Sequence, residues 1–333
     1  MKSAIRSGLG ATGLAVLAGL GFAVGLGGAI GTPATEDRGS ASDTERPDWK
    51  THWYDGRAEV SGYRLTQPRY GTKRTGKAVL IFVTERFSES ARVKADSGRH
   101  PPEDLFSVVK VGVVKDFQTG IYDYHLMTTA FVGLEPHGGR PAGALAKLTF
   151  SAQEWCGLTF EEWLPREGGL LRRAFSYFDG EGDRTLQLPL PANGWSVDQL
   201  LARIRGLPGP LLAPGQSVER PLLVRAERAV LFHRPVAWGP GRVSRSAETV
   251  SVEVPAGTFE VDVYRVESER FSYRFDVEHA FPHRIVRWTG PDGEQAELLG
   301  SERLRYWQLS GEGDASRLKG LGLPPQSLPP AAR

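Results

Sequence analysis

The single cysteine, Cys156, is the one thiol available for nucleophilic or redox chemistry, and it lies in the string QEWCG. A thiol nucleophile needs a neighbouring base or cation to raise its thiolate fraction. The nearest histidine in the sequence is His137, and Glu154 would disfavour a thiolate. We therefore predict that Cys156 acts as a small hydrophobic residue, packed beside Trp155 at the end of a strand. The alternative is a catalytic Cys156 with a spatial partner such as His125 or His233.

Three carboxylates alternate with glycine in the string DGEGD, which places Asp179, Glu181 and Asp183 as in oxygen-rich calcium loops. The string departs from that pattern because Arg184 stands where such a loop has glycine. A glycine-rich turn between two strands explains the same residues. We therefore predict no metal and no cofactor, with Asp179, Glu181 and Asp183 as the alternative ligands.

Aromatic side chains are abundant, with 8 Trp, 9 Tyr and 15 Phe. Tyr122, Tyr124, Trp155 and Tyr177 recur in segments with a strand pattern. Sheets favour aromatic residues for packing, so core filling is the expected use. The alternative is a barrel too wide for its own side chains, in which these four residues would line a ligand cavity.

Charge and cysteine usage exclude several classes of protein. The chain of 333 residues has 41 basic and 39 acidic side chains. Lys2 and Arg6 are the only charges in residues 1–34, so the rest of the chain is neutral. A neutral body lacks the basic field of a nucleic-acid binder. One cysteine excludes an internal disulfide and a multi-cysteine zinc site.

The N-terminus has the pattern of an export segment. A short basic head precedes an uncharged, glycine-rich apolar run, and Ala34 ends an acceptable cleavage site. Residues 1–34 are thus predicted to be a signal peptide. The alternative is an uncleaved inner-membrane anchor, and in that case we expect these residues to make the protein's only contact with the membrane. We predict an exported, periplasmic protein with a flexible linker at residues 35–47.

Period-two patterns dominate residues 48–308, which we predict to form one antiparallel β domain. Typical runs are residues 78–84, 108–114 and 271–277, and residues 250–263 read as a hairpin that turns at Gly257. Residues 196–205 predict a helix with Ser196 as its N-cap. The fold class is therefore mainly β, a barrel, half-barrel or sandwich with one or two short helices. Residues 309–333 read as a disordered Gly- and Pro-rich tail.

Several strings resemble known sequences. DFQTGIYDY and QEWCG resemble a group of uncharacterised exported bacterial proteins. The stretch VPAGTFEVDVYRVE, with YRFDVEHAFPHRIVRW, resembles a broader family of unknown function from the bacterial cell envelope. The resemblance implies export and a β fold, and it supplies no activity or catalytic residues.

Three function hypotheses follow. No familiar catalytic motif occurs, which favours a non-enzymatic envelope module that binds an apolar, lipid or cell-wall-derived ligand. The first alternative is an exported hydrolase that uses Cys156 or a carboxylate. The second is a structural or protein-binding component of the envelope.

Overall fold

The computed structural model describes residues 47–325. The predictions for the export segment 1–34, for linker residues 35–46 and for residues 326–333 lie outside the described residues. Within the described range, no helix is both long and apolar enough to cross a membrane.

One sheet of 17 strands forms the body. Its first half, in pairing order, is β9 (Arg184–Leu188), β8 (Gly169–Ser176), β7 (Gly157–Arg166), β6 (Leu145–Glu154), β5 (Tyr122–Gly133), β4 (Leu105–Thr119), β2 (Thr72–Ser88) and β1 (Ala58–Arg69). The order continues through β17 (Gln295–Leu304), β16 (Ile285–Thr289), β15 (Phe271–Glu278), β14 (Gly257–Ser268), β12 (Trp238–Arg245), β11 (Ser217–Leu223) and β10 (Trp195–Ser196). The short strands β13 (Val250–Val254) and β3 (Val93–Lys94) pair with β14 and β2.

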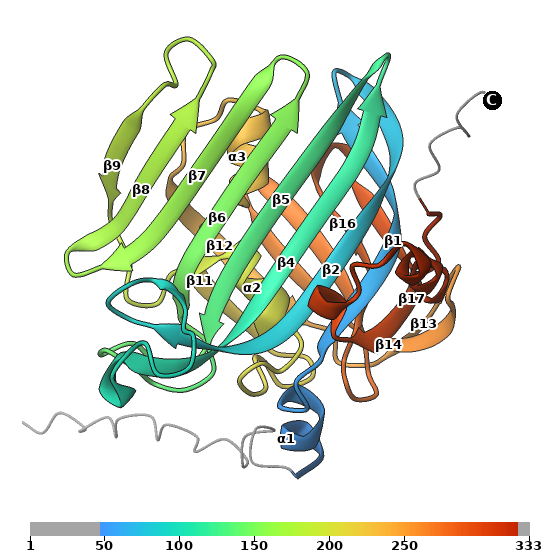
Figure 1. The fold of residues 1–333 in the computed structure, drawn as a ribbon, viewed down its shortest axis with the longest axis horizontal. Helices are drawn as coiled ribbons and strands as arrows, with labels where there is room; N and C mark the ends of the chain where they lie inside the picture. The colour runs from blue at the N-terminus through green and yellow to red at the C-terminus, as the bar shows by residue number, and fades with distance from the viewer. Residues whose placement is uncertain (1–46, 326–333) are drawn as a thin grey trace, which may run out of the picture. The chain divides into compact units, whose positions relative to one another are not determined.

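The sheet folds over into two facing layers, with β1 in the middle of the strand order (Figure 1). Among the described strands, β9 and β10 end the sheet and do not pair with each other, so it is not closed. The predicted mainly β, antiparallel class is confirmed as a half-barrel or sandwich, and the closed-barrel alternative is wrong. Among the strands of residues 47–325, every pair is antiparallel except β10–β11.

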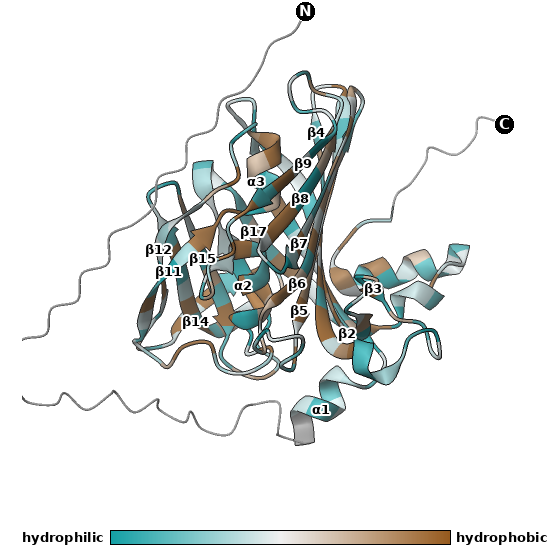
Figure 2. Cartoon of the chain, turned by 90° about the vertical axis from the view of Figure 1, so that its left-hand side faces the viewer, coloured by the Kyte–Doolittle hydropathy of each residue, from teal (hydrophilic) through white to brown (hydrophobic). Residues whose placement is uncertain are grey.

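Helices occupy the space between the layers. Figure 2 shows α2 (Val197–Arg203) and α3 (Ala226–Leu231) enclosed by the two sheet halves. Helix α1 (Pro47–Trp53) lies at one end, and four 3-10 helices complete the described chain: η2 (Pro102–Asp104), η3 (Pro291–Gly293), η4 (Tyr306–Gln308) and η5 (Glu312–Leu321). Ser196 caps α2 as predicted, because its side chain accepts the Asp198 N–H at 3.2 Å.

The predicted hairpin at residues 250–263 is confirmed as β13–β14, with Val252 opposite Phe259. Val252, Val254, Val261 and Val263 are buried on one side, while Val250 is exposed at the start of β13. Gly257 has a φ of +132°, a conformation that a side chain would strain.

A buried ionic network fixes both interior helices to the sheet. Lys115 of β4 is fully buried, and its Nζ donates to Glu227 of α3 at 2.8 Å and to Glu294 at 2.7 Å. Arg225, just before α3, donates to Asp198 of α2 at 3.0 Å. Because buried charges require partners, this network specifies where the two helices sit.

The C-terminal segment corrects the predicted tail. Residues 309–325 are ordered on the outer face of the sheet, where Leu321 and Leu323 are buried. The cause is a pair of facing glycines, Gly62 and Gly300, on neighbouring strands. A Cβ at Gly62 would lie 2.2 Å from the Leu321 carbonyl oxygen, so only a glycine lets the segment approach. The described body therefore extends to residue 325.

Candidate functional site

A cavity of about 460 Å³ lies where the two ends of the sheet face each other. Its walls come from β7 and β8 of the first half, from β11 and β12 of the second, from α2 and from the loops at residues 139–144 and 190–194. The large apolar side chains that line it are Leu145, Leu170, Leu190, Leu223, Trp195 and Trp238. The core side chains of α2 and α3 do not fill this space.

Trp238 holds the two ends of the sheet at this separation. Its Nε1–H donates to the carbonyl oxygen of Pro189, just after β9, at 2.7 Å. Its ring lies on Gly194, where a Cβ would come within 2.7 Å of a ring carbon. The segment between β9 and β10 therefore contacts β12 through the Trp238 side chain and not through strand pairing. The space between this segment and β12 forms part of the cavity.

The charged residues around the cavity are all basic. Arg140, Arg203 and Arg220 line it, and none of the lining residues is acidic. Arg140 forms an ion pair with Glu89, a carboxylate that also pairs with Arg92. Arg203 and Arg220 form no ion pair with any residue of the described chain, and Arg220 Nε is buried without a hydrogen-bond partner.

Trp195 is the shared neighbour of the two unpaired arginines. The guanidinium carbon of Arg203 lies 4.5 Å from the centre of the Trp195 ring, and that of Arg220 lies 5.3 Å from it. Both distances are within the range of a cation–π contact. A ring face attracts a cation but carries no net charge, so the two positive charges still lack an anion.

The electrostatics at Arg203 follow from this arrangement. Burial, and then the positive charge of Arg220, lower the pKa of Arg203 to about 10 from its ordinary 12.5. An anion in the cavity would act in the opposite direction and favour the charged form.

Helix α2 places Arg203 at the cavity. Gln199 and Arg203 are four residues apart and therefore lie on the same helical face. Gln199 donates from Nε2 to the carbonyl oxygen of Gly143, in the loop on the far side. The end of α2 is thus anchored to the cavity wall through Gln199, while Arg203 keeps its guanidinium free.

A second cavity, of about 270 Å³, lies between β7–β9 and α3 and differs in its chemistry. Here Arg172 is paired with Glu161, whose Oε2 accepts from Arg172 Nε at 2.9 Å. Glu161 also accepts from Trp163 Nε1 at 2.7 Å. These polar groups satisfy one another, which is typical of structural packing.

The tyrosines predicted as alternative ligand residues lie at the other end of the fold. Tyr124 is buried, stacks on Phe117 at 4.9 Å and accepts a hydrogen bond from Arg69 at 3.1 Å. Tyr122 packs half-buried against the same core. The pocket between Tyr124 and α3 measures about 20 Å³, room for about one water molecule. Tyr124 also lines a pocket of about 630 Å³ together with Phe117 and His125, so its use as a ligand residue stays a prediction.

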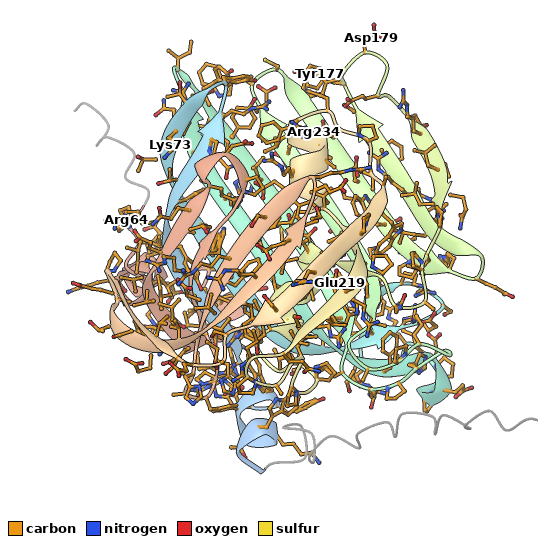
Figure 3. The ribbon with its side chains drawn as sticks, turned by 180° about the vertical axis from the view of Figure 1, so that it is seen from behind. Arg64, Lys73, Tyr177, Asp179, Glu219 and Arg234 are labelled. Atoms are coloured by element: carbon orange, nitrogen blue, oxygen red, sulfur yellow. The ribbon has the colours of Figure 1, made fainter. Side chains whose placement is uncertain are left out.

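Trp155 and Cys156 form the two-residue tip of the β6–β7 hairpin, and both are exposed. The prediction that Cys156 is packed is wrong, because this tip extends beyond the core and the Tyr177 ring packs on Gly157 instead. Figure 3 places Tyr177 at this end of the body, away from α1. Partial burial and the Glu154 carboxylate, whose Oε1 accepts from Tyr177 at 3.0 Å, raise the pKa of Tyr177.

At this end the polar neighbour of the Cys156 thiol is the Tyr177 hydroxyl, which stays protonated at neutral pH because its pKa is raised, and so cannot act as the base that a thiol nucleophile needs. His233, which lines the same small pocket, has its Nδ1 2.9 Å from Glu181 and its ring edge-on to Phe178. Glu154 instead accepts the backbone N–H of Cys156 at 3.0 Å.

The alternating carboxylates do not converge. Asp179 and Asp183 are exposed, and Glu181 faces His233; Asp179 points away from the body in Figure 3. Over residues 47–325, no group of three His, Cys, Asp or Glu side chains is placed to hold a metal ion.

Comparison with protein-family models, with curated proteins and with solved structures finds no match to this chain. The resemblance to envelope proteins therefore stays a prediction.

Proposed function

We propose that this protein is a non-enzymatic binding module that holds an apolar, chain-like ligand in the cavity between the two ends of its sheet. The observation that carries the proposal is the cavity itself, about 460 Å³ and lined by two tryptophans and four leucines. Small-molecule sites are commonly concave, mostly apolar and about 300–1,000 Å³ in volume.

The construction of the cavity supports the same function. Interiors are normally packed without voids of this size, because lost van der Waals contact destabilises a fold. Here the two ends of the sheet do not pair, and a hydrogen bond from Trp238 to the Pro189 carbonyl oxygen joins them. The exported, periplasmic location indicated by residues 1–34 belongs to the proposal, since an envelope offers lipids and other acyl chains.

Bromine quenching of tryptophan fluorescence tests this function. A brominated twelve-carbon alcohol and the matching brominated carboxylate should each quench the tryptophan fluorescence of the protein in a saturable way. Bromine quenches the fluorescence of an indole ring when the two are in contact. In the variant Trp195→Phe the quenched amplitude should fall, since Trp195 lines the cavity.

Trp155→Phe is the matched control, because Trp155 is 71% exposed at the other end of the fold. It should leave the quenched amplitude unchanged. Absence of saturable quenching by either chain, or loss of quenching only in Trp155→Phe, would contradict the proposal.

A further inference from the structure

The charges around the cavity indicate which class of apolar ligand it takes. Of its three arginines, only Arg140 has a carboxylate partner. Arg203 and Arg220 face the same space, share the Trp195 ring and repel each other. Two cations held near each other without a carboxylate are unfavourable in an empty site.

Three other arginines with little exposure do have a carboxylate partner. Arg225 is paired with Asp198 at 3.0 Å, and Arg205 is paired with Glu59 at 2.8 Å. Arg172 is likewise paired with Glu161. Arg69 is buried without a carboxylate, but it donates to the Tyr124 hydroxyl at 3.1 Å and to the Leu231 carbonyl oxygen. Arg203 and Arg220 differ because neither forms an ion pair with any residue of the described chain, and Arg220 Nε is buried without a hydrogen-bond partner.

From this arrangement we infer that the cavity binds an anionic amphiphile, an acyl or alkyl chain with a carboxylate or phosphate head group. The chain lies against the leucines and tryptophans, and the head group lies at Arg203 and Arg220. This inference rests on the proposed function and specifies the ligand for the same site. Arginine suits the role, because its planar guanidinium binds carboxylate and phosphate oxygens in two-point geometry.

Binding titrations with ligands that share one chain test the inference. Dodecanoate and dodecyl phosphate should each bind the wild-type protein about tenfold or more tightly than dodecanol, as charge-assisted hydrogen bonds predict. In the double variant Arg203→Met/Arg220→Met all three ligands should bind with similar affinity. Methionine keeps an unbranched apolar side chain at both positions, so dodecanol binding should change by no more than about threefold.

The control variant is Arg242→Met, which removes an arginine of β12 that is 58% exposed and paired with Glu219. It should retain the preference for anionic ligands. Acetate and inorganic phosphate distinguish an amphiphile from a free anion, and both should bind far more weakly than the chain-bearing forms. Inorganic phosphate binding as tightly as dodecyl phosphate would overturn the inference.

The remaining outcomes separate the inference from the proposed function. Equal wild-type affinities for dodecanoate, dodecyl phosphate and dodecanol would overturn the anionic preference and leave the apolar site standing. No binding of any chain would overturn both. A preference for anions that survives in Arg203→Met/Arg220→Met would place the head group elsewhere and contradict the assignment to these arginines.

Discussion

Lys115→Met should lower the free energy of unfolding by about 3–5 kcal/mol, the cost of breaking a buried ion pair. Lys115 is fully buried, and its Nζ contacts Glu227 at 2.8 Å and Glu294 at 2.7 Å. Its removal would leave the Glu294 carboxylate to the more distant Arg225, 3.6 Å away. Urea denaturation of the two proteins measures the loss.

Lys77→Met is the matched control, because Lys77 lies on the outer face, about a third exposed, and 3.6 Å from Asp116. Its loss should stay within about 1 kcal/mol, as for surface ion pairs. Similar losses in the two variants would show that the buried network contributes no more than an exposed pair.

The same network has a pH signature. Burial would raise the pKa of Glu294, but Lys115 and Arg225 outweigh it and lower the value from 4.5 to about 2. A lowered carboxyl pKa contributes stability above the unfolded value and loses it as the pH falls. The difference between wild type and Lys115→Met should therefore narrow as the pH falls from about 5 toward 2.

Arg203→Met should act in the opposite direction and raise the free energy of unfolding of the empty protein by about 1–3 kcal/mol. Its pKa is lowered to about 10 by burial and by Arg220, so below that pH the charged form destabilises the fold. Methionine removes the charge and keeps an unbranched apolar side chain at the cavity. Thermal and urea denaturation at neutral pH measure the gain.

Arg242→Met, an exposed control, should change stability by no more than about 0.5 kcal/mol. A loss of stability in Arg203→Met would mean that the guanidinium is satisfied within the protein and needs no ligand. A gain would fit a site that keeps an unfavourable charge for binding, since functional groups are often retained at a cost in stability.

Local patterns in the sequence predicted much of the sheet. The alternation from Val250 to Val263 is a property of neighbouring residues, and so are Ser196 and the helix that it caps. The pattern over residues 222–232 fits neither a strand nor a helix alone, because β11 ends at Leu223 and α3 begins at Ala226. Elements this short do not show a clear hydrophobic periodicity, because that pattern is recognisable only over longer segments.

The candidate site escaped prediction because its parts meet only through long-range pairing. Trp195 lies beside β11 because β10 and β11 pair in parallel, with Trp195 opposite Leu222, and this brings Arg220 near. Nothing within a few residues of Arg203 or Arg220 marks either arginine as unpaired. The ordered segment at residues 309–325 was not predicted for the same reason. Gly62 and Gly300 lie side by side, and so let this segment approach the sheet, only because β1 and β17 pair.

A crystal structure of the protein with dodecanoate brominated at the end of its chain would test the ligand site most directly, because the anomalous scattering of bromine locates the chain. We expect one bromine peak inside the cavity against Leu170 and Trp195, with the carboxylate at Arg203 and Arg220. A bromine peak in the small pocket beside Tyr124 and Tyr177, or no peak on the protein, would contradict this assignment.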